Sequence, residues 1–493
     1  MLGNIGQGLL LLTSVTNFIC INVGLFLGII FGALPGLTVT LAIALFLPFT
    51  FNLNSVSGIL MLLGIYCGGT YGGSISAILL RTPGTPSAAA TAIDGYELAQ
   101  KGHPKKALLM ALTASAIAGL ISAFILLFAG PQIAKATLFF GSAEFATLAI
   151  FGLSIVASLC SENLPKGLIS VSLGLFVSTI GIDSFEGTYR FVFDNYHLYG
   201  GIELIPALIG LFAIPEILKK GKTTTEGSSG QLKLRKDDRL SLKEVKDNLK
   251  VIVQSSLIGT VIGAIPGTGG GIAAFISYDQ AKKSSTHPEE FGKGCLTGVA
   301  APEAGNNGVT GATLIPLLAL GIPGDASVAV LLGAFMMHGL IPGASLFTDY
   351  GPIVYALMTG LIVTNIFMWI QGRVLIKYFA MLTVKVPERV LTPILLFLCV
   401  AGTYSLNNTM YDIYVIVLFG AIAYTLSKFG YSIIPLLLGI ILGPTLEQNM
   451  RRALTISNGS LSIFVTRPIS VGFIVITFLS IVLPLLQKKK QTK

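Results

Sequence analysis

Apolar runs separated by short polar stretches recur along almost the whole chain. A helix of about 20 apolar residues can cross the hydrocarbon core of a bilayer, and many runs approach this length. Several runs are shorter and end at Gly or Pro, which indicates half-helices or re-entrant hairpins. The pattern predicts an all-α polytopic membrane protein with about 10–14 membrane segments. The apolar segments lie near 9–34, 37–51, 56–80, 107–129, 137–160, 166–182, 201–218, 251–265, 267–280, 295–320, 326–345, 352–376, 390–403, 411–427, 431–443 and 469–487.

Composition supports this interpretation. Hydrophobic residues make up 53% of the 493 residues and charged residues only 11%, whereas soluble domains average about 25% charged residues. This excludes a soluble enzyme, a disordered protein and a nucleic-acid-binding protein. The net charge of +9 comes from basic residues in a few loops and the C-terminal tail, as the positive-inside rule predicts, rather than from a nucleic-acid or lipid-binding patch. The five cysteines are scattered and have no CxxC motif, so we expect buried apolar thiols.

The longest polar stretch runs from Lys219 to Lys250 and contains ten Lys/Arg and five Asp/Glu. Its basic character places it in the cytoplasm. Ser241, followed three residues later by Glu244, predicts a capping box that opens a short surface helix. The predicted organisation is a first membrane repeat, a basic linker, a second membrane repeat, and a final transmembrane helix with a basic cytoplasmic tail. Their bounds are 1–218, 219–250, 251–465 and 466–493.

Two pairs of motifs relate the two halves. GIIFGALPG at 28–36 matches GTVIGAIPG at 259–267, an offset of 231. Pro83-Gly84 matches Pro323-Gly324 at an offset of 240, and Gly68, Thr70 and Ser87 then meet Gly308, Thr310 and Ser327. The extra residues fall in the loop at 282–294. Two matches in the same order indicate an internal duplication, which is common in secondary transporters.

Loop charge predicts that the repeats are inverted. The first half has a basic loop at 101–106, and its equivalent in the second half, IPGASLF, has no charge. The second half has Lys282, Lys283 and Lys293 after its first Pro-Gly motif, where the first half has only FNLNS. Equivalent loops of opposite charge character should face opposite sides of the membrane. Arg451-Arg452 falls outside in this arrangement, against the rule.

Four Gly/Pro-rich elements interrupt the apolar runs, at 32–36, 68–87, 263–271 and 301–327. Broken backbone within a bilayer is tolerated only where protein or a water-filled cavity shields it. The N-terminus of a half-helix offers free N–H groups to an anion. Paired breaks at corresponding places in two halves therefore predict a transport site. The alternative is close packing and kinking, for which Gly and Pro are also used in membrane helices.

Polar side chains within these elements are the candidate ligands. Asn306, Asn307, Thr310 and Asp325 could coordinate a cation or hydrogen-bond a carboxylate; helix-to-helix bonding, or N-capping by Asp325, is the alternative. Glu303 is the acid that we would test for binding of a coupling ion or proton. Arg81 could be a buried counter-charge for a carboxylate, although reaching out to the interface is the favoured interpretation because Pro83 follows at once. Ser74, Ser76, Thr82, Thr85 and Ser87 belong to the first-half element.

No enzymatic motif is present. The sequence contains no GxxxxGK[ST] phosphate loop, no HExxH and no GxSxG, and GAIPGTGGG lacks the GxGxxG pattern of a dinucleotide site. We therefore expect neither catalysis nor a cofactor, and no metal beyond a possible coupling Na⁺.

The motifs resemble those of the large membrane subunit of the tripartite tricarboxylate transporter family. The similarity rests on GALPG, GIYCGGTYGGSISAILLRTPGTPSAAATAIDGYELAQKG, GAIPGTGGG, APEAGNNGVTGATLIPLLALGIPGDASVAVLLGAFMMHGLIPG and LGPTLEQNMRRAL. It implies a bacterial inner-membrane symporter for di- or tricarboxylates such as citrate, driven by Na⁺ or H⁺. It also implies two partners, a periplasmic solute-binding protein and a small membrane subunit.

The matching stretches 68–87 and 304–327 are where the resemblance places the site. We expect the substrate at Gly69, Thr70, Ser74, Ser76, Thr82, Pro83, Gly84, Thr85, Ser87, Asn306, Asn307, Gly308, Pro323 and Gly324. We expect the coupling ion at Asn306, Asn307, Thr310, Asp325 and Glu303. Arg81 stands where a neutral polar residue such as Asn is expected, so the substrate of this member stays open. A channel, or a carrier for another small anion, is the alternative.

Overall fold

The computed structural model describes residues 2–159, 164–183, 185–220, 238–385 and 388–491. Helices dominate this part of the chain, and its only strands are β1 (Gly181–Ile182) and β2 (Tyr189–Arg190), an antiparallel pair. Six of the described helices are long and apolar enough to cross a membrane, and six shorter ones of 10–17 residues are also apolar. The predicted all-α polytopic membrane fold is confirmed. Residues 221–237 of the predicted linker and Cys160 lie outside the described residues, and Cys20, Cys67 and Cys399 are buried.

The chain forms two compact units. Unit 1 comprises residues 1–134 and 216–402, and unit 2 comprises residues 135–215 and 403–493. Each predicted half therefore contributes its earlier segment to unit 1 and its later segment to unit 2.

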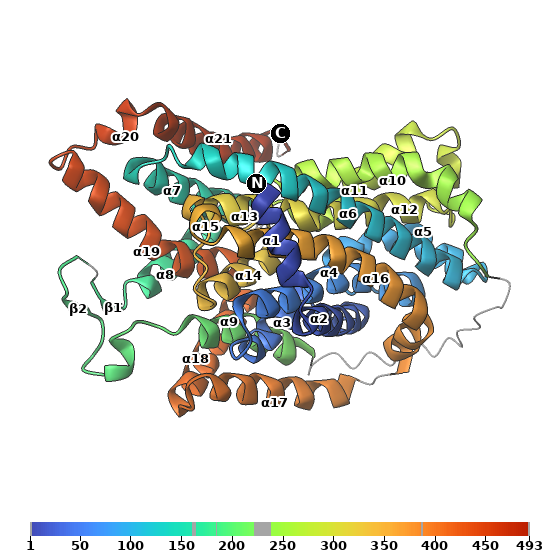
Figure 1. Ribbon diagram of the computed structural model, residues 1–493, viewed down its shortest axis with the longest axis horizontal. Coiled ribbons are helices and arrows are strands. Elements are labelled where there is room, and N and C mark those ends of the chain that lie inside the picture. The colour runs from blue at the N-terminus through green and yellow to red at the C-terminus, as the bar shows by residue number, and fades with distance from the viewer. Residues whose placement is uncertain (1, 160–163, 184, 221–237, 386–387, 492–493) are drawn as a thin grey trace. The chain divides into compact units, whose positions relative to one another are not determined.

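Unit 1 contains all four Gly/Pro-rich elements. Its helices are α1 (Leu2–Leu12), α2 (Val15–Ala33), α3 (Val39–Phe46), α4 (Ser55–Leu80), α5 (Thr91–Gln100), most of α6 (Pro104–Thr137), α10 (Leu242–Gly263), α11 (Gly269–Ser284), α12 (Thr297–Ala312), α13 (Leu314–Leu320), α14 (Ala326–Met337), α15 (Ala344–Asp349), α16 (Gly351–Lys385) and most of α17 (Glu388–Asn407), with the short 3₁₀ turns η1 (Pro48–Thr50), η2 (Pro86–Ala89) and η4 (Pro288–Glu290). Within it, α10, α11 and α12 pack together, at the upper right of Figure 1.

Glycines let the helices of unit 1 approach closely. A Cβ atom on Gly24 of α2 would lie 2.1 Å from the Met61 carbonyl oxygen of α4, far inside van der Waals contact. Gly28 and Gly32 continue this stripe one and two turns further along α2. Small residues at such spacing allow the backbones of membrane helices to touch, which maximises dispersion contacts where no hydrophobic driving force exists.

The second half repeats these contacts at the offsets found in the sequence. In the first half, two glycines of α2 contact the backbone of α4, and in the second half, two glycines of α10 contact the backbone of α12. The pairs are Gly28–Ile65 and Gly32–Gly69 in the first half, and Gly259–Gly305 and Gly263–Val309 in the second. The glycines differ by 231 positions and their partners by 240, so the structural equivalence supports the internal duplication.

Loops at the ends of unit 1 also pair across the halves. Lys101 donates to the Lys293 carbonyl oxygen at 2.5 Å, which joins the two basic loops. The corresponding loops of the other halves also meet. His338 lies 3.2 Å from the Thr50 hydroxyl through its Nε2 atom, and its carbonyl oxygen accepts a hydrogen bond from Ser55 at 3.2 Å. Two repeats related by a two-fold axis, parallel or inverted, produce this exchange. The orientation of the halves in a membrane stays a prediction.

The predicted capping box is confirmed at the start of α10. Ser241 accepts a hydrogen bond from the Glu244 N–H, and the Glu244 side chain accepts one from the Ser241 N–H. The expectation of a short surface helix is wrong, because the same helix continues without a break to Gly263.

Burial raises the pKa of Glu244, but hydrogen bonds from Lys106 and Ser241 outweigh it and lower the pKa to about 2. This carboxylate therefore stays charged and ties α10 to the basic loop at 101–106.

Unit 2 is built around α19, which packs against α7 and α8. Its helices are α7 (Ser142–Leu159), α8 (Leu164–Ser178), most of α9 (Leu204–Lys220), α18 (Met410–Lys428), α19 (Ile433–Ile456), α20 (Ile463–Thr466) and α21 (Pro468–Gln491), with the 3₁₀ turn η3 (Tyr196–Leu198). Helix α19 continues through Pro444, beyond the end near 443 that the sequence suggested.

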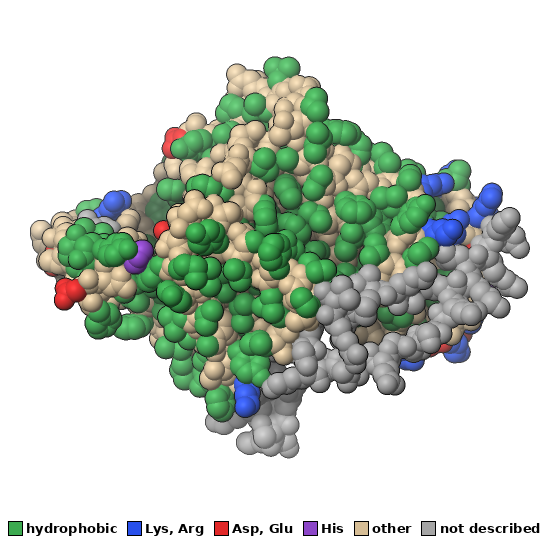
Figure 2. Space-filling model, turned by 90° about the horizontal axis from the view of Figure 1, so that it is seen from below, with side chains coloured by type: hydrophobic (Ala, Val, Ile, Leu, Met, Phe, Trp, Pro, Cys, Tyr) green, Lys and Arg blue, Asp and Glu red, His purple; other side chains and the backbone are tan. Residues whose placement is uncertain are grey.

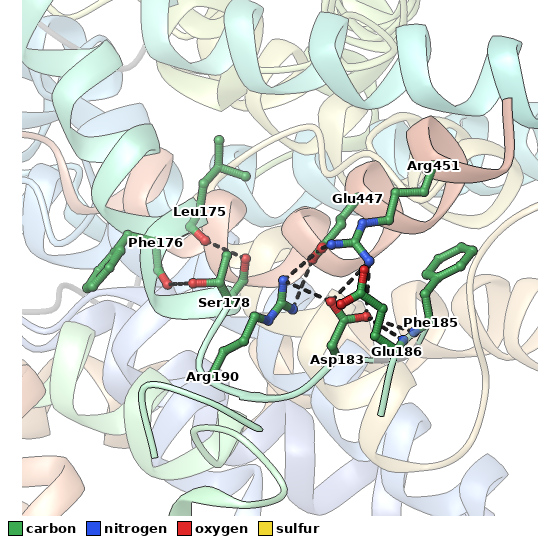
Figure 3. A network of polar contacts seen from close by, with 10 residues as sticks. Leu175, Phe176, Ser178, Asp183, Phe185, Glu186, Arg190, Glu447 and Arg451 are labelled. Carbon is green, nitrogen blue, oxygen red and sulfur yellow. Dashed lines mark hydrogen bonds and ion pairs between the residues drawn. The ribbon is translucent and has the colours of Figure 1, made fainter. Parts of the chain in front are cut away.

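Four charged side chains hold the β1–β2 loop of unit 2 to α19 (Figure 3). Arg190 forms an ion pair with Glu447 at 2.8 Å, and Arg451 forms one with Asp183 at 3.0 Å. Backbone N–H groups of Phe185 and Glu186 and the two arginines lower the pKa of Asp183. These ion pairs fix the β1–β2 loop against α19, and the side of the membrane on which Arg451 and Arg452 lie stays a prediction.

Large hydrophobic side chains remain exposed all over the chain. They spread across the face seen in Figure 2, where Lys and Arg gather at only a few places. Soluble monomers rarely expose apolar patches larger than a few hundred Å². Such a surface fits the apolar interior of a lipid bilayer.

Candidate functional site

The first break lies at the end of α4. This helix runs unbroken from Ser55 to Leu80, although the sequence suggested that the interruption begins at Gly68. The helical glycines serve contact with neighbouring helices instead: a Cβ on Gly68 would meet the Leu25 carbonyl oxygen at 2.6 Å, and one on Gly69 would meet Val39 at 2.9 Å. The interruption is therefore confined to the residues from Arg81 onward.

Arg81 ends α4 in a left-handed conformation, with φ 56°. Its side chain is 66% exposed, lies 3.9 Å from Glu97 and stacks over the Tyr96 ring. The geometry agrees with an arginine that reaches out from the helix end, and not with a buried counter-charge. Thr82 is exposed next to it, and its hydroxyl donates to the Leu80 carbonyl.

The chain turns back into the protein directly after Thr82. Pro83 is partly buried, and Gly84 and Thr85 are buried. The Gly84 N–H donates to the Gly73 carbonyl of α4 at 3.3 Å. The Thr85 and Ser87 hydroxyls are 3.1 Å apart. This segment is the part of the first break that brings polar groups inside unit 1.

The second break has the same plan. Gly321, 240 positions after Arg81, ends α13 in the left-handed conformation, with φ 72°. Pro323 and Gly324 are buried, and the Gly324 carbonyl accepts the Gly267 N–H at 2.8 Å. The chain then enters α14. Both halves thus interrupt a helix at equivalent positions with a residue in the left-handed conformation, which strains Arg81 but not Gly321.

Asp325 caps α14. Its carboxylate accepts the Val328 N–H at 2.8 Å and the Tyr66 hydroxyl at 2.9 Å. Tyr66 also lies 3.1 Å from the Thr313 hydroxyl. Of the two alternatives that the sequence left open for Asp325, the geometry favours N-capping.

Each break touches the short helix of the opposite half. Ser327 after the second break lies 3.0 Å from the Thr40 hydroxyl of α3. In the exchanged arrangement, a Cβ on Gly270 of α11 would lie 3.2 Å from the Ser87 Cβ after the first break. The two breaks are therefore related to each other in the way that the duplication predicts, and both lie within unit 1.

Several predicted ligands bond within their own helices. The hydroxyls of Thr70, Ser74, Ser76 and Thr310 donate to carbonyls three or four residues earlier. Asn306 donates across to the Thr70 carbonyl of α4 at 3.4 Å, and a Cβ on Gly308 would press against Ser256 of α10. These residues pack α4, α10 and α12 together, and their hydroxyl lone pairs remain able to accept.

Glu303 and Asn307 belong to a separate buried cluster in unit 1. Both side chains lie on α12, and Ser115 of α6 bridges them: it donates to Glu303 at 2.9 Å and accepts from Asn307 at 2.8 Å. Sequence reasoning missed Ser115, and also Thr91, which donates to Glu303 at 2.5 Å. Neither lies in a Gly/Pro-rich element, so no local signal could have identified them.

Sequence reasoning also missed Tyr66 and Tyr71. Both lie in the motif IYCGGTYGG, and hydroxyl-bearing aromatic residues in a glycine-rich membrane helix were an available signal.

Among the residues that the structure describes, no group of three or more His, Cys, Asp or Glu side chains is placed to hold a metal ion.

The chain is similar to known proteins over most of its length. The profile of the tripartite tricarboxylate transporter TctA family matches residues 18–438. An Agrobacterium vitis protein, described as an uncharacterized 52.8 kDa protein in the TAR-I ttuC' 3' region, is 35% identical over 487 residues, or 99% of this chain and 96% of that protein. A second protein of that organism, described as an uncharacterized protein in the TAR-II ttuC' 3' region, is 38% identical over 229 residues, 46% of this chain and 94% of the relative. No solved structure matches the chain.

Proposed function

We propose a mechanism of carboxylate import for this chain, which belongs to the tripartite tricarboxylate transporter TctA family, as its motifs indicated. The family makes it a membrane component of tripartite tricarboxylate transport. In our proposal it is a secondary active carrier that imports small organic di- or tricarboxylates with a sodium or proton gradient. It receives them from a periplasmic solute-binding protein and works with a small membrane subunit in a bacterial inner membrane.

The proposed substrate site lies between the two breaks of unit 1. One observation carries it: each break is followed by a serine, Ser87 or Ser327, that lies against the short helix of the opposite half. The start of α11 joins the two breaks, because a Cβ on Gly269 would lie 3.8 Å from the Asp325 Cβ and one on Gly270 would lie 3.2 Å from the Ser87 Cβ. Hydroxyls from both halves thus gather in one region, where they can share the negative charge of a carboxylate.

Alternating access follows from the same contacts. Because the serines meet helices of the opposite half, a shift of one repeat-derived element against the other would open the region to one side or the other. Carboxylates bound there would cross together with the coupling ion.

Uptake into proteoliposomes tests the proposal. The chain, reconstituted with its small subunit and given the binding protein outside, should accumulate a radiolabelled carboxylate from a panel of di- and tricarboxylates. Uptake should saturate and require a sodium or proton gradient. Vesicles without the chain are the control. Ohmic single-channel currents, or uptake that only equilibrates under every gradient, would contradict a coupled carrier and favour a channel.

A further inference from the structure

Glu303 is a carboxyl group enclosed by hydroxyls. It lies on α12 with no exposed surface. Thr91 of α5 donates to its Oε1 atom at 2.5 Å, and Ser115 of α6 donates to its Oε2 atom at 2.9 Å. No Lys, Arg or His among the described residues forms an ion pair with it. A charge in this position is stabilised only by neutral donors.

Two buried polar atoms near this carboxyl group have no hydrogen-bond partner within the part of the chain that the structure describes. Asn307 points its amide nitrogen to Ser115 and to the Glu303 carbonyl oxygen, and its Oδ1 atom is left without a donor. The Tyr71 hydroxyl of α4 lies within electrostatic range of Glu303, is buried and has no hydrogen-bond partner. Unpaired buried polar atoms are rare and costly, so the cluster lacks one component.

A proton is the component that fits. An isolated buried carboxylate is costly because it has lost its hydration, and protonation removes its charge. Protonation also creates one O–H donor, which the orphaned Asn307 Oδ1 or Tyr71 Oη can accept. The Asn307 Oδ1 atom and the remaining lone pairs of the Ser115 and Thr91 hydroxyls are also of the type that binds sodium, so the transport experiment below includes a sodium gradient.

The electrostatic surroundings leave this carboxyl group free to change its charge. The titratable side chains that face this part of α12 among the described residues are Tyr71 of α4, Asp94 of α5, Tyr278 of α11 and Cys295 just before α12. Asp94 is occupied, since it accepts the N–H groups of Gly292, Gly294 and Cys295 and the Tyr278 hydroxyl. No fixed cation competes with a proton at Glu303 among the described residues.

We propose that Glu303 carries the coupling proton. A hydronium ion on the outer side gives up a proton and becomes water, and the proton forms an O–H bond at a Glu303 carboxyl oxygen. The same bond breaks toward the cytoplasmic side after the carrier has turned, and the carboxylate is restored. The role of this proton in import rests on the proposed function, whereas its binding at Glu303 does not.

Infrared spectroscopy tests the binding directly and needs no transport. In the purified chain in lipid, acidification should produce the carbonyl band of a protonated, buried carboxyl group. Glu303→Gln should remove that band, and the exposed Glu290→Gln should keep it. If the Gln variant does not fold, Thr91→Val serves instead: it removes a donor to the charged form, so the midpoint of the band should move to higher pH. An unchanged band in Glu303→Gln, or an unmoved midpoint in Thr91→Val, would overturn the proposal.

Transport then tests the role of the proton. With Glu303→Gln, which stays neutral, accumulation under a proton gradient should be lost while exchange of internal for external carboxylate continues. Accumulation by this variant, or a wild-type chain driven by sodium and indifferent to a proton gradient, would overturn proton coupling at Glu303. A wild-type chain that moves no carboxylate under any gradient would instead contradict the proposed function, and the infrared result would stand apart from it.

Discussion

Replacing Gly84 with alanine should unfold or inactivate the carrier more severely than any other single glycine substitution at the breaks. The added Cβ would lie 1.9 Å from the Gly32 carbonyl oxygen and 2.8 Å from the Ser76 hydroxyl oxygen. The first is a backbone atom of α2, which is itself packed against α4, so no side-chain rotation relieves the overlap. Overpacking of this kind costs about 1–3 kcal/mol and shifts backbone.

Two other glycines provide matched comparisons for Gly84→Ala. At Gly324 the nearest atoms belong to the Thr313 side chain at 2.6 and 2.7 Å, so a smaller loss is expected. At Gly271 the nearest atom is the Pro86 carbonyl oxygen at 4.0 Å, an ordinary contact, and the variant should resemble the wild type. The melting temperature in detergent and the rate of carboxylate uptake should both be highest for Gly271→Ala, lower for Gly324→Ala and lowest for Gly84→Ala. A wild-type melting temperature for Gly84→Ala would contradict the packing described for the first break.

Asp325→Ala should lose both stability and uptake, whereas Asp325→Asn should keep most of each. The alanine variant removes the acceptor for the Val328 N–H, and loss of an N-cap costs about 0.5–2 kcal/mol. It also leaves the Tyr66 hydroxyl with only Thr313. An asparagine oxygen still accepts the Val328 N–H and retains a polar group beside Tyr66.

The contrast between the two variants separates capping from ion binding. If the Asp325 charge held the coupling ion, the asparagine variant would lose accumulation as completely as the alanine variant. Tyr66→Phe is the control, because it removes one hydrogen bond to Asp325 and leaves the cap of α14 intact. Uptake and thermal unfolding of the three variants measure the difference. Loss of accumulation in a stable Asp325→Asn protein would return Asp325 to the set of coupling-ion ligands.

Much of the fold could be predicted because the bilayer imposes simple rules on sequence. Apolar runs identified the membrane helices, and matched Pro-Gly motifs identified the duplication. Helix ends were harder: α4 continues through Gly68–Leu80, α10 joins a surface segment to a membrane segment, and α19 passes Pro444. In α4 the glycines meet neighbouring helices, and no sequence pattern distinguishes that use from a break. The split of each half between two units depends on tertiary packing, which local pattern does not report.

The site shows the same limit. The left-handed turns at Arg81 and Gly321 fall next to the Pro-Gly pairs that the sequence singled out, and Glu303 was identified as a carboxyl group to test. The partners of these groups were not found, because Thr91, Ser115 and Tyr66 reach them across long separations in sequence. Arg81 illustrates the opposite case, in which an interpretation based on the proline that follows agrees with its exposed position.

Substrate protection at the two breaks tests the central claim most directly. In a chain whose native cysteines have been replaced, Thr85→Cys and Ser327→Cys place one thiol after each break, and Thr286→Cys places one in an exposed loop. Thiol labelling of the purified carrier in lipid is then timed with and without a transported carboxylate. We predict that the carboxylate slows labelling at both break positions and leaves the loop position unchanged. Equal labelling rates with and without carboxylate at both breaks would contradict a substrate site formed by the two halves together.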